Sequence, residues 1–112
     1  MERNVEELLN DYREKAFEYA RAKAHRTYIE EFKKSKFALL MRQADKAGFK
    51  TAAAQEREAF ASEDYQQLLT GLQAAVEAEE RLRYDMKADE MQLEVWRTIR
   101  ADERQERKVY GT

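Results

Sequence analysis

The sequence contains no proline, no cysteine and only three glycines among its 112 residues. Because proline and glycine are the strongest helix breakers, almost nothing in the chain interrupts a helix. The lack of cysteine excludes disulfide bonds and thiolate metal sites. Nucleic-acid-binding modules usually carry an excess of basic charge, whereas the net charge here is −2. The longest apolar run, Phe37–Met41, is far too short for a membrane span or a signal-peptide core, so we expect a cytoplasmic protein.

Helix-forming residues dominate what is present, with Ala, Glu, Arg, Leu, Lys and Gln the commonest types. Hydrophobic residues make up 43% of the chain and charged residues 39%. This mixture is too apolar for a disordered chain and too highly charged for a compact α/β enzyme. It predicts a single all-α domain over residues 1–112, built from long helices.

Capping residues and glycines divide the chain into predicted helices. Asn4 indicates a helix start. Gly48 indicates a left-handed helix end, with Phe49 folding back toward Leu40 or Ala44.

Thr51 and Ser62 can each cap a following helix, and Gly111 provides the next stop. Gly71 lies inside the last helix, and we expect the other long helix to approach it closely; a tolerated surface glycine is the alternative. The predicted helices span about residues 4–47, 52–61 and 63–109.

Each long helix carries a row of apolar residues at three-four spacing, which is typical of helices that pack side by side. In the second long helix the row consists of Tyr65, Leu68, Leu72, Ala75, Leu82, Met86, Leu93 and Trp96. Glu79 is its charged member, and we expect it to set the register by pairing with a basic residue of the first helix. In the first helix the row shifts to steps of four, so the apolar face winds around the helix and one partner helix cannot cover it.

The charge distribution predicts that the two long helices run antiparallel. The first helix begins acidic and becomes basic in its middle, whereas the second is acidic in its middle and basic at its end. Folding the chain once at residues 48–62 brings opposite charges together, with position 12 near 97 and position 26 near 83. Exposed pairs contribute only ~0.5 kcal/mol each, so they select the register more than they stabilise the fold. The sequence thus predicts an antiparallel hairpin with a short helix at its tip.

The aromatic content exceeds what one seam between two helices can bury, which predicts a homodimer in the form of a four-helix, coiled-coil-like bundle. The predicted core or dimer residues are Tyr12, Tyr19, Tyr28, Phe32, Leu72, Leu82, Met86, Leu93 and Trp96.

No catalytic, cofactor-binding or metal-binding pattern occurs in the sequence. Phosphate-binding loops, nucleophile elbows and His-Glu-x-x-His are absent. The one histidine, His25, has no glutamate three residues before it, so a surface or seam position is expected. We predict that the protein is not an enzyme and needs no cofactor.

Two basic segments are candidate contacts for nucleic acid or a partner. Lys33, Lys34 and Lys36 lie between Phe32 and Phe37, which suggests phosphate contacts and base stacking. On a helix the two rings do not share one face, so solvated lysines beside core aromatics are the favoured interpretation. The second segment places four arginines on one face of the last helix: Arg97, Arg100, Arg104 and Arg107. Acidic residues interleave with them, which favours a self-paired, solvated helix.

Four segments resemble small helical proteins encoded by tailed bacteriophages and prophages. They are Lys50–Tyr65, Leu69–Leu72, Glu80–Tyr84 and Glu94–Arg97, and the resemblance extends over about residues 25–104. Genes for such proteins tend to lie near those for single-strand annealing, single-strand-binding and replication proteins. The resemblance implies a role in the host bacterial cytoplasm, with a phage or host recombination or replication protein as partner.

Three functional hypotheses follow. The first is a non-enzymatic accessory protein of phage DNA recombination or replication that acts by binding another protein. The second is a single-stranded DNA-binding accessory protein that uses the lysines and arginines named above. The third is a helical protein of virion assembly. None of the three involves a membrane.

Overall fold

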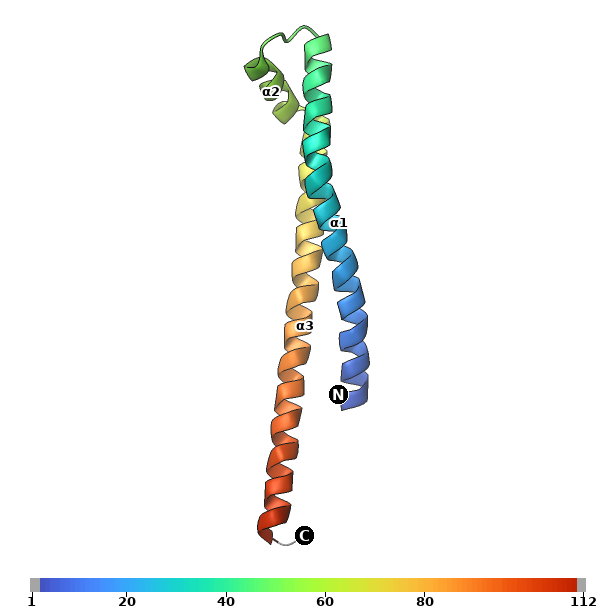
Figure 1. The fold of residues 1–112 in the computed structure, drawn as a ribbon, viewed down its shortest axis with the longest axis vertical. Coiled ribbons are helices and arrows are strands. Elements are labelled where there is room, and N and C mark those ends of the chain that lie inside the picture. The colour runs from blue at the N-terminus through green and yellow to red at the C-terminus, as the bar shows by residue number, and fades with distance from the viewer. Residues whose placement is uncertain (1–2, 111–112) are drawn as a thin grey trace. The chain divides into compact units, whose positions relative to one another are not determined.

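The computed structural model describes residues 3–110, and within them the chain forms three α-helices and no strand (Figure 1). The helices are α1 (Val5–Lys46), α2 (Ala52–Ala61) and α3 (Glu63–Tyr110). The predicted all-α fold is therefore confirmed, and the predicted helix limits differ from these by at most one residue at each end. Gly111, the predicted stop of the last helix, lies outside the described residues.

The first helix begins and ends within one residue of the predicted limits because specific hydrogen bonds cap it. The Asn4 side-chain oxygen accepts a hydrogen bond from the backbone N–H of Glu7 (2.8 Å). Gly48 has a φ of +109°, a backbone conformation that favours glycine. The N–H of Phe49 donates to the carbonyl oxygen of Ala44 (3.0 Å), which completes a Schellman-type helix end.

Hydroxyl groups cap the other two helices. Thr51 Oγ1 accepts a hydrogen bond from the N–H of Ala54 (3.1 Å), and Ser62 Oγ accepts one from the N–H of Tyr65 (3.2 Å). Ser62 Oγ also donates to the carbonyl oxygen of Ala59 (2.8 Å), so this one side chain ends α2 and starts α3.

Contacts within the chain divide it into two compact units. The terminal unit comprises residues 1–20 and 80–112, of which 3–20 and 80–110 are described. The central unit comprises Arg21–Glu79 and includes all of α2. Each unit contains a segment of α1 and a segment of α3.

The core of the central unit lies where α2 contacts both long helices. Leu40, Ala59 and Tyr65 are buried there, one from each helix. The Tyr65 ring also packs against the rings of Phe37 and Phe60. The centroids of these three rings lie 4.6 to 5.8 Å apart, in tilted or edge-on arrangements. Ala59 is only 1% exposed, so its small side chain allows α2 to approach closely.

Ion pairs also join α1 to α3 in the central unit. Arg26 contacts both carboxylate oxygens of Glu79, the interaction expected for the charged member of the apolar row. Lys36 Nζ lies 3.3 Å from Asp64 Oδ2. Residue numbers rise along α1 as they fall along α3, so the two segments run in opposite directions within this unit.

Two sequence-based details of packing are wrong in the central unit. Position 26 lies beside 79 and not 83, a shift of about one turn. The shift arises because Tyr65, at the start of α3, packs against Leu40, well before α1 ends at Lys46. The close approach expected at Gly71 is also absent, because no side chain or second backbone lies within 4 Å of where its Cβ would be.

Candidate interaction surface

A buried carboxylate anchors the terminal unit. Asp89 is only 1% exposed, and its two oxygens accept hydrogen bonds from Arg3 Nη2 and Lys15 Nζ, each at 2.9 Å. Burial by itself raises the pKa of Asp89, but the hydrogen bonds from Lys15 and Arg3 outweigh it, so the pKa is lowered. Asp89 fills the gap in the apolar row between Met86 and Leu93, and this gap is the signal in the sequence that could have identified it.

Further polar contacts hold the start of α1 against α3. Arg3 also donates to Asp11 (2.7 Å) and to the side chain of Gln92 (3.2 Å). The Tyr12 hydroxyl donates to Glu90 Oε1 (2.6 Å), and this hydrogen bond raises the pKa of Tyr12. Tyr12 therefore lies beside Glu90 and not beside position 97, so the predicted register is wrong by about two turns in this unit.

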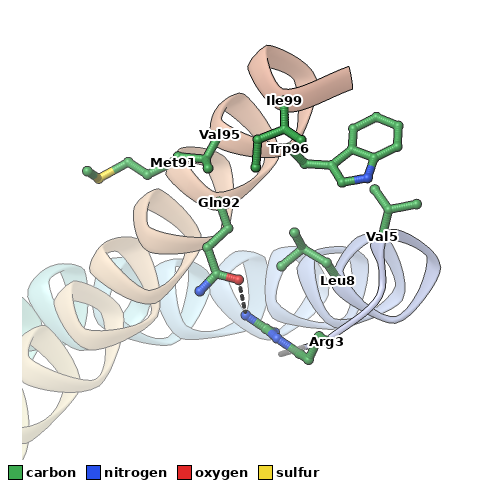
Figure 2. Close-up of a pocket in the computed structure, with 8 residues that line it drawn as sticks. All are labelled: Arg3, Val5, Leu8, Met91, Gln92, Val95, Trp96 and Ile99. Atoms are coloured by element: carbon green, nitrogen blue, oxygen red, sulfur yellow. Dashed lines mark hydrogen bonds between the residues drawn. The ribbon is translucent and has the colours of Figure 1, made fainter. Parts of the chain in front are cut away.

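An apolar groove opens between α1 and α3 in the terminal unit. Its volume is about 480 Å³. Figure 2 shows Val5 and Leu8 of α1 facing Trp96 of α3, with Arg3 and Gln92 joined at one side. Its remaining lining residues, Met91, Val95 and Ile99, all come from α3. The groove forms because α1 covers only part of the apolar surface that α3 carries here.

A second apolar row runs along α3 in the terminal unit, and we call it the outer stripe. It consists of Tyr84, Ala88, Met91, Val95 and Ile99. All five residues are exposed, and the four large side chains are each more than half accessible to solvent. The spacing of four, three, four and four residues places them on one side of the helix. This row was not predicted from the sequence, because the predicted apolar row of this helix was the one that packs against α1.

The predicted core or dimer residues separate into two groups. Six are half-buried: Tyr12, Tyr19, Leu72, Leu82, Met86 and Leu93. Three are exposed: Tyr28, Phe32 and Trp96. Tyr28 and Phe32 stack on each other with ring centroids 6.0 Å apart, on a side of α1 that its neighbours in the central unit leave open.

The predicted lysine cluster does not form a common surface. Lys33 and Lys36 are half-buried, and Lys36 is paired with Asp64 of α3. Lys34 is exposed but lies 3.2 Å from Glu31, one turn earlier in α1. Only Lys34 is as exposed as the favoured interpretation of solvated lysines beside core aromatics expects; of the two aromatics, Phe37 is half-buried and Phe32 is exposed.

The predicted arginines do come together. They line a hollow of about 300 Å³ with two further residues, and the full set is Trp96, Arg97, Arg100, Glu103, Arg104 and Arg107. The Arg100 guanidinium lies 5.7 Å from the centre of the Trp96 ring and 3.2 Å from Glu103. Arg104 and Arg107 form no ion pair with another residue of the described chain. The hollow therefore has basic character beside an aromatic ring.

His25 is exposed, as expected for a surface histidine. No group of three or more His, Asp or Glu side chains within residues 3–110 is arranged to hold a metal ion. Within the same residues no helix is both long and apolar enough to cross a membrane. No family model, no curated protein and no solved structure matches the chain.

Proposed function

We propose that this chain is a non-enzymatic protein-interaction module that doubles back once as an antiparallel hairpin, forms a homodimer and binds another protein. The observation that carries the proposal is the exposed apolar surface of the terminal unit. Large apolar side chains along the outer stripe remain open to solvent in a single chain. Contiguous exposed apolar surface of this kind marks protein contact sites in folded proteins.

The contacts inside each unit support the hairpin. In the central unit Arg26 pairs with Glu79 and Lys36 with Asp64. In the terminal unit Arg3, which precedes α1, contacts Asp89 and Gln92, whereas Tyr12 of α1 contacts Glu90 and Lys15 contacts Asp89. In both units the contacts made by α1 itself pair rising numbers in α1 with falling numbers in α3, as one reversal of the chain requires.

The partner that we propose is a phage or host recombination or replication protein, and this part rests on the resemblance to phage-encoded helical proteins. The test is to mix the purified chain with a single-strand annealing protein and a single-strand-binding protein of a tailed bacteriophage, and to follow co-elution by size-exclusion chromatography. An unrelated helical protein of similar net charge serves as control. Co-elution of the chain, but not of the control, supports the proposal; separate elution at micromolar concentration counts against it.

Binding of single-stranded DNA is a second candidate function, favoured by the basic hollow beside Trp96. Aromatic stacking combined with phosphate contacts is the usual chemistry of such sites. Fluorescence anisotropy with a labelled oligonucleotide at two salt concentrations tests it, since phosphate contacts weaken steeply with salt. Arg104→Ala weakens binding in this case, whereas Lys34→Ala, which removes the same charge from the central unit, does not. No binding by the intact chain at low salt would remove this candidate.

A further inference from the structure

We infer that the outer stripe is the surface through which two copies of the chain associate, and that their α3 helices cross it in antiparallel orientation. The inference rests on the proposed homodimer and specifies its interface. It concerns only the α3 segment of the terminal unit, from Tyr84 to Ile99.

The outer stripe has the pattern of a helix that packs against a further helix. α3 already uses one apolar row, which includes Leu82, Met86 and Leu93, toward α1. The outer stripe is a second row on the same helix, with its own three-four spacing. A helix with two such rows is typical of bundles in which it contacts two neighbours. The single chain supplies one neighbour here, so the second row needs another.

A second copy fits this row because its own stripe is complementary when the helix direction is reversed. In an antiparallel pair centred between Ala88 and Met91, Tyr84 of one copy lies opposite Val95 of the other. Ala88 then lies opposite Met91, so that each layer combines a large side chain with a smaller one. A two-fold axis relates the two copies, so each of these contacts occurs twice, as expected of a contact between identical surfaces.

The charges beside the stripe select the antiparallel orientation. Lys87 and Glu94 are exposed, lie seven residues apart and flank the same edge of the stripe. In the antiparallel pair Lys87 of each copy lies opposite Glu94 of the other, which makes two ion pairs. In a parallel pair the corresponding cross-helix positions join Lys87 to Gln92 and Glu94 to Ile99, and no ion pair results. Opposite charge at these positions therefore favours only one orientation.

Within a single chain, Lys87 and Glu94 make only weak contacts, so both remain able to form ion pairs across the interface. Glu94 lies 2.9 Å from Arg97 one turn away, and both side chains are about two-thirds exposed. The Lys87 ammonium lies 5.2 Å from the centre of the Tyr84 ring. Exposed contacts of this kind within one helix contribute little to stability, so exchange for a contact across the interface costs little.

The groove between α1 and α3 lies where Tyr84 of the second copy, the largest side chain of its outer stripe, meets the first copy. Met91, Val95 and Ile99 belong both to the outer stripe and to the lining of the groove. In the antiparallel pair the Tyr84 ring of the other copy lies opposite Val95. Association therefore covers apolar surface from both helices of the terminal unit, and not from α3 alone.

Charge reversal at the two flanking positions tests the interface and its orientation together. Lys87→Glu places two glutamates opposite each other, and Glu94→Lys places two lysines opposite each other. Each variant alone weakens self-association by about tenfold, because two attractive pairs become repulsive. An equimolar mixture of the two variants forms heterodimers at least as tightly as the unmodified chain, because every pair then joins opposite charges. The double variant, with both reversals in one chain, regains self-association.

Sedimentation equilibrium over a range of micromolar concentrations measures these dissociation constants, and circular dichroism verifies equal helix content. Lys34→Glu, a charge reversal at an exposed site of the central unit, is the matched control and leaves association unchanged. A monomeric unmodified chain would overturn the proposed homodimer and this interface with it. A dimeric unmodified chain whose two variants associate as tightly as it does, alone and mixed, overturns the interface and leaves the homodimer standing.

Discussion

Replacing Asp89 with asparagine tests whether a buried carboxylate holds the terminal unit together. Asp89 is almost wholly buried in the row that faces α1, and its oxygens accept hydrogen bonds from Arg3 and Lys15. Asparagine has nearly the same shape but carries no charge. Its amide oxygen can accept one hydrogen bond, whereas its NH₂ group faces the second cation and cannot accept from it.

The size of the effect follows from these contacts. A hydrogen bond to a charged group contributes about 1.5–3 kcal/mol, and Asp89→Asn loses one such bond and weakens the other. The cations it leaves behind are partly open to solvent, since the side chains of Arg3 and Lys15 are 29% and 27% exposed and can be rehydrated. We therefore expect a loss of about 2 kcal/mol in the free energy of unfolding, less than the ~3–5 kcal/mol typical of breaking a fully buried pair.

Urea unfolding at pH 7 and one fixed protein concentration, followed by circular dichroism, measures this loss. Asp85→Asn removes an exposed carboxylate one turn earlier in α3, so it is the matched control, and we expect it to change the free energy of unfolding by less than about 0.5 kcal/mol. If Asp89→Asn unfolds at the same urea concentration and with the same slope as the unmodified chain, the anchoring role of Asp89 is refuted.

The difference in stability between the unmodified chain and Asp89→Asn has a defined pH dependence. Because folding lowers the pKa of Asp89, its contribution to stability is present above the unfolded pKa of about 3.9 and is lost as the pH falls through the lower folded value. The difference in unfolding free energy between the unmodified chain and Asp89→Asn should therefore be constant above about pH 5 and shrink below about pH 4. A difference that grows on acidification would contradict the direction of this shift.

Three further predictions concern other positions. Gly71→Ala should stabilise the fold by up to about 1 kcal/mol in thermal or urea unfolding, because the site is exposed, helical and free of neighbours; destabilisation would indicate a contact that the structure lacks. Gly48→Ala should destabilise by about 1–2 kcal/mol in the same assay, because its φ is +109°; an unchanged midpoint would argue against the left-handed helix end. Arg26→Glu and Glu79→Arg should each lower the unfolding midpoint while the double exchange recovers part of the loss, since the two side chains pair across helices; strictly additive effects would show that they do not interact.

The helices and their limits could be predicted because local chemistry determines them. Asn4, Thr51 and Ser62 supply oxygens to free N–H groups, and Gly48 permits the left-handed turn. Each of these signals acts within four residues of its position, so no knowledge of tertiary structure is needed. The pairing of Glu79 was also predictable, because a lone charge in an apolar row needs a partner of opposite charge.

The register between the helices was not predictable from charge alone. Opposite charges attract over many alignments, and exposed pairs contribute too little to distinguish shifts of one or two turns. The observed alignment follows from packing in the central unit, where Ala59 lets α2 lie close to Leu40 and Tyr65. This alignment depends on how the side chains of three helices fit together, and the apolar periodicity of a single helix does not predict that fit. Asp89 was missed for a different reason, since it counted only as one of the acidic residues in the middle of the second long helix and was not placed in the apolar row.

The two apolar rows of α3 are chemically distinct, and this difference assigns each to a different neighbour. The row that faces α1 contains Glu79 and Asp89, whose charges are matched by Arg26 and by Lys15 with Arg3. If two α3 helices met through this row, each would bring buried carboxylates whose present partners belong to the α1 side of the chain, at a cost of several kcal/mol for each charge left unpaired. The outer stripe carries no charged residue in its apolar positions, so an identical helix can pack against it without that cost. The acidic residues therefore match one face of α3 to α1, and the other face is the one open to the proposed self-association.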